Sequence, residues 1–237
     1  MRGEALKSNE EQLKSRGYVE DIDLKNYSDL SKEELLSYLN SKEAFKRTVA
    51  GKVIKKYKET SILTELISSL IVEKKLYTKI ALSESIGEYG EDACCLLIEY
   101  LGKVGKNQYK ELPDKPFDKS NYPLPRDIIA RTICKIGIPA LKQLRECLHT
   151  GSYEQILEAI DAIGFISYYE NDNSCQNDII ILMDKYKSDN LMLWKLIRAL
   201  QSFANDEVLD LLKRFIFSNI KQHQWEALRS IEQIQKR

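Results

Sequence analysis

The chain has 237 residues, of which 43% are hydrophobic and 30% charged, and its 36 basic residues balance its 36 acidic residues. This composition supports a buried core, but no apolar run approaches the roughly 18 residues that a membrane helix needs, so we expect no membrane segment. The charged N-terminus lacks the apolar stretch of a signal peptide, which predicts a cytoplasmic protein. Five cysteines without a CxxC pair and two isolated histidines argue against a zinc site, and we expect neither metal nor cofactor.

In chain order, residues 1–28 form a polar segment that we interpret as an N-terminal lead-in or cap, and residues 29–237 form the repeat domain. Ser31 and Glu34 have the spacing of a capping box, which predicts that a helix begins there. Beyond them, apolar residues return with the period of helices rather than strands, so we expect no sheet. The expected helices pair as 61–72 with 75–89, 91–103 with 125–136, 139–149 with 152–167, 176–187 with 190–203, and 206–219 with 222–235.

One pattern recurs in the second helix of each pair, where an anchor residue precedes a large aliphatic residue by four positions. The anchors are Ala50/Ile54, Leu82/Ile86, Thr132/Ile136, Ala159/Ile163, Leu196/Leu200 and Ala227/Ile231. Three of these segments end in an Ile-Gly pair, at Gly87, Gly137 and Gly164. Successive aliphatic anchors lie 27 to 50 residues apart, a period that indicates stacked helical hairpins.

The longest interval contains an insertion, residues 104–125, in which four of the five prolines lie. Proline lacks the amide hydrogen that a helix needs, so this segment is predicted to be a loop. Insertions of this kind leave one face of a repeat array and often bind ligands, although a tolerated surface loop would look the same. Its aromatic residues Tyr109, Phe117 and Tyr122 favour the functional interpretation.

The hairpin period, the anchors and endings such as Ala159-Ile-Asp-Ala-Ile-Gly164 resemble the HEAT repeat family, including its phycobilisome-lyase-like subgroup, over residues 31–235. The resemblance implies an all-α, right-handed superhelical solenoid of about six HEAT-like hairpins, in which the second helices line the concave face. It also implies a scaffold that holds another macromolecule. Some members are similar to chromophore lyases and others to DNA-alkylation-repair glycosylases, so the enzyme question remains open.

Charged residues occupy the second-helix positions that project away from the core stripe. Arg131 is followed in the next repeat by Glu158 and Asp161, then by Lys195 and Arg198, and then by Glu226. Neighbouring helices lie about 8–10 Å apart, close enough for these side chains to pair. The alternating signs therefore predict either ion pairs that fix the stacking of repeats or a polar groove that binds a peptide.

A basic cluster in residues 46–58 is the best candidate for binding nucleic acid or another polyanion. Such a run is usually a solvated helix face, and the acidic residues that follow it would repel a phosphate backbone. We therefore expect at most weak, salt-sensitive binding, and nucleic acid is an unlikely partner. The candidate polyanion-binding residues are Lys46, Arg47, Lys52, Lys55 and Lys56.

No Ser/His/Asp arrangement, glycine-rich phosphate loop or HExxH motif occurs, and we assign no catalytic residue. Trp194 and Trp225 occupy equivalent positions in consecutive second helices, so we expect them to lie near each other and to pack between repeats. They form no recognisable catalytic set with an acid, although Asp161 and Glu226 stay open as candidates. This weakens the glycosylase interpretation.

The leading hypothesis is a non-catalytic scaffold or adaptor that binds a protein or peptide partner through its concave groove and the insertion. The alternatives are a HEAT-type enzyme, glycosylase-like or lyase-like, and a weak nucleic-acid binder. The candidate protein-binding residues are Arg131, Glu158, Asp161, Lys195, Arg198, Tyr109, Phe117 and Tyr122.

Overall fold

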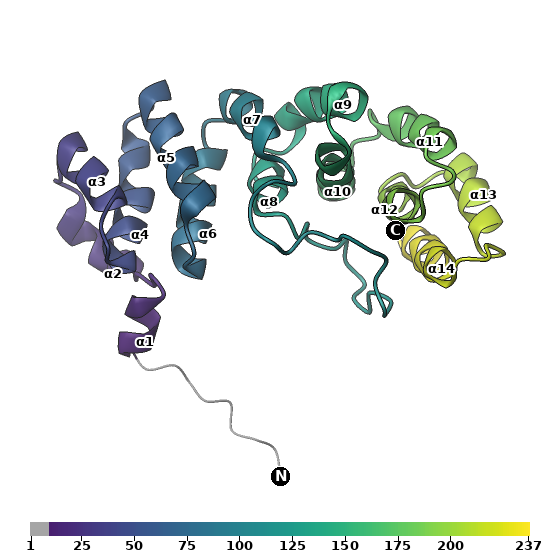
Figure 1. Cartoon of the computed structure of the whole chain (residues 1–237), viewed down its shortest axis with the longest axis horizontal. Coiled ribbons are helices and arrows are strands. Elements are labelled where there is room, and N and C mark those ends of the chain that lie inside the picture. The colour runs from purple at the N-terminus through teal and green to yellow at the C-terminus, as the bar shows by residue number, and fades with distance from the viewer. Residues whose placement is uncertain (1–9) are drawn as a thin grey trace, which may run out of the picture. The chain divides into compact units, whose positions relative to one another are not determined.

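The computed structural model describes residues 10–237, and over these residues it consists of helices joined by turns and loops, without a strand (Figure 1). The chain divides into two compact units, Met1–Tyr89 and Gly90–Arg237, which we call the N-terminal and the C-terminal unit. The predicted all-α repeat fold is confirmed within each unit. The two helices of a pair contact each other, and the second helix of one pair contacts the second helix of the next.

The helices of the N-terminal unit are α1 (Glu10–Ser15), α2 (Asp21–Leu24), α3 (Lys32–Leu39), α4 (Ala44–Val53), α5 (Thr60–Val72) and α6 (Leu76–Gly87), with 3-10 turns at Lys25–Tyr27 and Ile54–Lys56. Those of the C-terminal unit are α7 (Glu91–Leu97), α8 (Ile128–Cys134), α9 (Leu141–Thr150), α10 (Tyr153–Glu170), α11 (Gln176–Lys185), α12 (Asn190–Leu200), α13 (Asp206–Phe215) and α14 (Lys221–Gln235), with 3-10 turns at Ile98–Tyr100 and Ile138–Ala140.

In the N-terminal unit, α4 packs against α3 and α6, and α5 packs against α6. Its core contains the anchors Ala50, Ile54, Leu82 and Ile86, all fully buried. The predicted helix start at Ser31 is confirmed, since the Ser31 hydroxyl accepts from the Glu34 amide while the Glu34 carboxylate accepts from the Ser31 amide. The predicted lead-in reaches into residues 1–9, which lie outside the described residues.

The C-terminal unit has two rows of helices. Helices α8, α10, α12 and α14 follow one another in contact, and α9, α11 and α13 pack on the other side of that row. Figure 1 shows α9, α11 and α13 along the outer side of this unit's curve and α10, α12 and α14 along its inner side. We call the inner side of α10, α12 and α14 the inner face.

The repeat anchors of this unit lie in the core with two exceptions. Ala159, Ile163, Leu196 and Leu200 are fully buried. Ile136, however, is only half-buried, because α8 ends at Cys134 and the chain turns at Gly137, whose φ is +74°. Ile231 is half-buried in α14, which packs against α12 and α13.

The helix expected over residues 152–167 runs past its Ile-Gly pair at Gly164. Helix α10 continues through this residue to Glu170. A Cβ atom on Gly164 would clash with the hydroxyl group of Tyr122, which comes from the insertion. The missing side chain therefore gives a residue of another segment room to approach the helix, rather than ending the helix.

The repeat alignment predicts that equivalent anchors contribute to stability according to their burial. Leu200→Ala should lower the free energy of unfolding by about 2–5 kcal/mol, because it opens a cavity in a close-packed core. Ile231→Ala should cost clearly less, because this side chain is already partly hydrated in the folded state. Urea denaturation followed by circular dichroism compares the two, and equal losses would contradict the burial difference.

Candidate protein-binding surface

The insertion crosses the inner face instead of projecting from it. We call residues 104–125 the inserted segment, and Figure 1 shows it on the inner side of α10, α12 and α14. The ring of Tyr109 packs edge-on against Trp194 of α12, with 4.9 Å between centroids. The side-chain amide of Gln222 in α14 donates to the carbonyl oxygen of Pro113 over 3.3 Å. Phe117 lies beneath the guanidinium of Arg229, 5.5 Å from the ring centre.

Tyr122 anchors the far end of the inserted segment. Its side chain is 2% exposed and sits over Gly164, with Tyr168 of the same helix 5.6 Å away between ring centroids. The Tyr169 hydroxyl donates to the main-chain carbonyl of Tyr122 over 3.3 Å. The sequence singled out Tyr122 as an aromatic residue of a surface loop, but the structure buries it more deeply than Tyr109 or Phe117.

This arrangement buries helix α12 on all sides. Every residue from Leu191 to Leu200 is buried, including Lys195 with 0% and Arg198 with 4% exposure. Glu158 and Asp161 of α10 are also buried, with 2% and 4% exposure. The expectation that these rows line an open groove is therefore wrong, because the inserted segment covers them.

Beneath the segment, the charged rows pair across neighbouring helices. The Lys195 ammonium lies 2.8 Å from a Glu158 carboxylate oxygen and 3.0 Å from an Asp161 oxygen, and it also donates to the Leu157 carbonyl over 3.0 Å. On the other side, Arg198 lies 3.1 Å from Glu226 of α14. The predicted pairing between consecutive second helices is confirmed for these residues.

Glu226 also accepts from Arg229 over 2.6 Å, and Arg229 donates to the side-chain carbonyl of Gln201 over 2.5 Å. The Arg198 guanidinium stacks on Trp194, with 3.8 Å between its central carbon and the ring centre. One expected partnership does not form. Among the described residues, no ion pair joins Arg131 to Glu158 or Asp161, and its Nε donates instead to the Pro125 carbonyl at the end of the inserted segment.

Six buried polar atoms around this network have no hydrogen-bond partner in the described part of the chain. Three are donors on α12, the residue that follows it, and α14; two are carboxylate oxygens on α10, and one is a hydroxyl on the inserted segment. They are Arg198 Nε, Gln201 Nε2, Arg229 Nη1, Glu158 Oε2, Asp161 Oδ1 and the Tyr122 hydroxyl. A buried polar atom without a partner costs roughly 1–3 kcal/mol, so the segment covers the inner face without satisfying it.

Burial changes the acid–base behaviour of Glu158. Removal from water, reinforced by the neighbouring Asp161, raises the pKa of Glu158 to about 7, against the lowering influence of Lys195. The stabilisation that Lys195 gives to the charged form is smaller than the loss of hydration in this environment. Glu158 therefore exchanges a proton near neutral pH.

The candidate polyanion-binding residues lie in the N-terminal unit and contact acceptors there. Lys46 pairs with Glu43, Lys52 with Asp21 and Lys55 with Glu88. Lys56 donates to the main-chain carbonyls of Ser28 and Leu30. Their charge is thus partly neutralised locally, and their binding to a polyanion stays a prediction.

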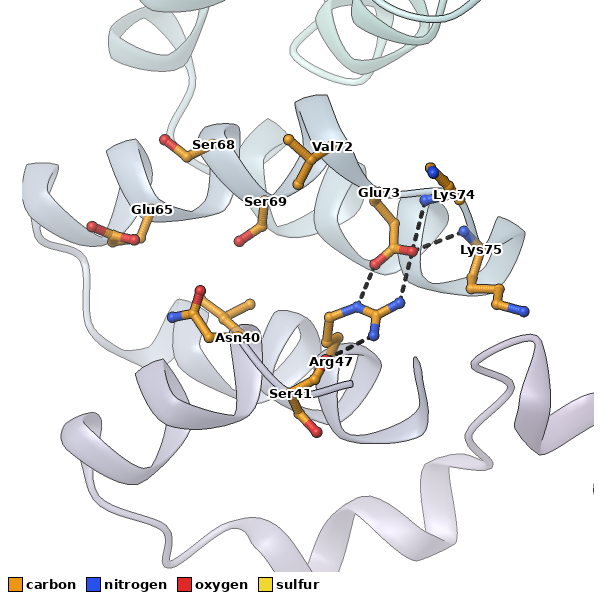
Figure 2. A pocket seen from close by; sticks show the side chains of 11 residues that line it. Asn40, Ser41, Arg47, Glu65, Ser68, Ser69, Val72, Glu73, Lys74 and Lys75 are labelled. Atoms are coloured by element: carbon orange, nitrogen blue, oxygen red, sulfur yellow. Dashed lines mark hydrogen bonds and ion pairs between the residues drawn. The ribbon is translucent and has the colours of Figure 1, made fainter. Parts of the chain in front are cut away.

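Arg47 has the most complete set of partners. It lines a pocket of about 450 Å³ that also includes Asn40, Glu65 and Ser68 (Figure 2). Its Nε and Nη2 donate to the two carboxylate oxygens of Glu73 over 2.7 and 2.9 Å, and its Nη1 donates to the carbonyl of Ser41 over 2.8 Å. Because every nitrogen of this guanidinium already donates, Arg47 acts as a cross-link between helix pairs rather than as a free anion ligand.

The structure brings most of the candidate protein-binding residues together. Glu158, Asp161, Lys195, Arg198, Tyr109 and Tyr122 meet around the inner face, and Arg131 lies at the edge of the segment. The two tryptophans lie in different surroundings. Trp194 is buried against the segment, whereas the Lys221 ammonium lies 4.9 Å from the ring centre of Trp225. No ring contact joins them in the described structure.

Sequence reasoning missed the roles of three residues. Gly164 makes room for Tyr122, Gln222 donates to the Pro113 carbonyl, and Gln201 accepts from Arg229. Gly164 carried a signal, because a glycine inside an apolar helix often marks close approach of another segment. The two glutamines carried none that would separate them from other polar surface residues. Within the described residues, no group of three or more His, Cys, Asp or Glu could hold a metal ion, and no helix is long and apolar enough to cross a membrane.

Comparison with known proteins gives a limited result. No family model matches the chain, and no curated protein sequence matches it. Among solved structures, the chain is similar to a designed armadillo repeat protein, with 16% sequence identity and a TM-score of 0.34, over 86% of this chain and 100% of that one.

Lys195 provides a direct test of the buried network. Lys195→Met should lower the free energy of unfolding by roughly 3–5 kcal/mol, because it leaves two buried carboxylates without their cation. Lys213→Met is the matched control, since Lys213 pairs with Asp210 on the exposed side of α13 and its loss should change stability little. Similar effects of the two substitutions in urea denaturation would contradict the burial of this pair.

The raised pKa of Glu158 predicts a pH dependence. Because the folded state holds the proton up to about pH 7, whereas the ordinary value is 4.5, Glu158 contributes stability at low pH that is lost as the pH rises through 7. His223, whose pKa is lowered by burial, acts in the opposite direction, so the wild type must be compared with Glu158→Gln. The wild type should lose stability relative to this variant between pH 5 and 8, and parallel stability curves would contradict the assignment.

Proposed function

We propose that this protein is a non-catalytic helical-repeat scaffold that binds a protein partner through the inner side of its C-terminal unit, with the inserted segment as part of the contact. One observation carries the proposal. The inner face already holds an extended stretch of polypeptide, through contacts that repeat surfaces use for peptides.

Three of these contacts support the proposal directly. Gln222 recognises a main-chain carbonyl, which any extended peptide offers. Trp194 and Arg198 together receive an aromatic side chain, and Arg229 lies over another. Aromatic and arginine side chains dominate the energetics of protein interfaces, and here they come from two neighbouring helices of a rigid row.

An enzymatic role is the second candidate, because Trp194 and Arg198 share one environment with Asp161 and Glu158. We favour the scaffold, since Lys195 pairs with both of these carboxylates, Arg198 pairs with Glu226, and all of these side chains are buried. The HEAT and lyase-like resemblances stay predictions. Weak polyanion binding by the basic residues of the N-terminal unit is likewise a prediction, and it is independent of this proposal.

Site-specific cross-linking in the cells that make the protein tests the proposal. A photo-reactive amino acid at Asp118, exposed on the inserted segment, should give a discrete adduct with a protein partner. The same amino acid at Ile181, which is 63% exposed on α11 on the outer side, is the matched control and should not give that adduct. Adducts of equal yield at both positions, or none at Asp118, would remove the support for an inner-side contact.

A further inference from the structure

We infer that the inserted segment is a displaceable internal ligand, and that the partner is an extended peptide with an aromatic and an acidic side chain that takes its place on the inner face. The inference rests on the proposed function, because it assigns the partner's chemistry and the regulation of the same surface.

The inserted segment is held by packing of its aromatic rings and by side chains of the helices that donate to its carbonyls at Pro113, Tyr122 and Pro125. From Val104 to Arg126, the described main chain forms no hydrogen bond with other main-chain groups. Gly105 lies near the start of the segment with a φ of +83°, and nothing would contact a Cβ atom placed there. Glycine adopts this conformation without strain, and the open space leaves the chain free to turn at this point. The segment can therefore leave without breaking helix-to-helix contacts.

Tyr122 is the principal attachment at the other end. Its ring fills the space over Gly164, but its hydroxyl has no hydrogen-bond partner although it lies within the fields of Asp161, Arg198, Glu226 and Arg229. The Tyr122 ring therefore packs closely against the helix, while its hydroxyl forms no hydrogen bond with the polar groups around it. A peptide that matches these polar groups would compete with it on favourable terms.

The unpartnered donors indicate which side chain such a peptide carries. Arg198 Nε, Gln201 Nε2 and Arg229 Nη1 belong to α12, the residue that follows it, and α14. Glu226 pairs with both arginines, and Arg229 donates to Gln201. Glu226 faces both arginines and Asp161 also faces Arg198, yet these three donor atoms still have no acceptor. A carboxylate accepts from several donors at once, whereas a lysine ammonium is itself only a donor and would leave these atoms without a partner.

Trp194 and Arg198 indicate the second feature of the peptide. Tyr109 occupies their surface with its ring 4.9 Å from that of Trp194 and 5.8 Å from the guanidinium carbon of Arg198. It is only partly buried there, and Arg126 of the same loop covers its other side at 4.4 Å. An aromatic residue of a partner reproduces these contacts once the segment has moved.

The test uses the full-length protein and a fluorescein-labelled synthetic peptide of residues 104–127. Two variants are designed to release the segment by disrupting the contact between Tyr122 and Gly164, each from one of its two partners. Gly164→Ala places a methyl group where the Tyr122 hydroxyl lies, and Tyr122→Ala removes the side chain without changing the helix. Gly51→Ala is the matched control, since Gly51 also lies inside a packed helix but its Cβ would meet only Leu82, at 3.1 Å from a methyl group, and no part of the segment.

Opening is measured first, by trypsin cleavage at the exposed Lys106, Lys110 and Lys119. Both opening variants should be cut in the segment faster than the wild type and Gly51→Ala. Circular dichroism identifies a variant that has lost its fold, and the other opening variant then carries the test. Unchanged cleavage in folded opening variants would overturn the role of Tyr122 as the attachment.

Binding is measured next, by fluorescence anisotropy. Because a face that is open for less than about a tenth of the time lowers the apparent affinity at least roughly tenfold, Tyr122→Ala should bind the peptide at least about tenfold more tightly than the wild type. Gly164→Ala should not, because its methyl group also occupies the place of the peptide's own tyrosine. Equal binding to all four proteins would overturn the competition but leave the proposed protein-binding face intact. No binding to folded Tyr122→Ala would overturn the inference, and the proposed function would then depend on the cross-linking result alone.

The partner's chemistry is tested with two further peptides, in which the tyrosine corresponding to Tyr122 is replaced by glutamate or by lysine. The glutamate peptide should bind the opened variants several-fold more tightly than the lysine peptide, and the difference should shrink with added salt. Equal affinities, or a preference for lysine, would overturn the assignment of an acidic side chain.

Discussion

The organisation of the C-terminal unit depends on the seating of Tyr122 over Gly164. A helix interior rarely offers room for a side chain from elsewhere, and here the absence of one Cβ atom provides it. Once this ring is in place, the inserted segment must cross the inner face to return to α8. The covering of α12, the burial of its charges and the raised pKa of Glu158 all follow from that path.

The charged network beneath the segment is costly to bury and is therefore weak evidence for stability as such. Its value lies in geometry, because each ion pair connects one inner helix to the next, Lys195 toward α10 and Arg198 toward α14. Such pairs fix the register of neighbouring repeats while the apolar anchors supply most of the favourable burial. The orphaned donors and acceptors mark where this compromise is incomplete, at the surface where the segment lies.

The sequence predicted the helices, the loop and the pairing of charges because all three are local or periodic. Helix ends at Ser31 and Ser152 follow capping chemistry, and the anchors follow the 3.6-residue period. It could not predict that the loop folds back, since this depends on contacts between residues about 40 to 110 positions apart, such as Tyr122 with Gly164 and Pro113 with Gln222. For the same reason, the charged rows were expected in an open groove and the half-buried state of Ile136 and Ile231 was not expected.

The central claim is that the inserted segment covers the inner face and is held there by Tyr122. Acrylamide quenching of Trp194 fluorescence, in a Trp225→Phe background, measures this most directly because Trp194 is 1% exposed beneath Tyr109. The account predicts that Trp194 is shielded from acrylamide and becomes accessible when Tyr122→Ala is added, while the helix content is unchanged. Free access of acrylamide to Trp194 before that substitution, or continued shielding after it, would contradict the account.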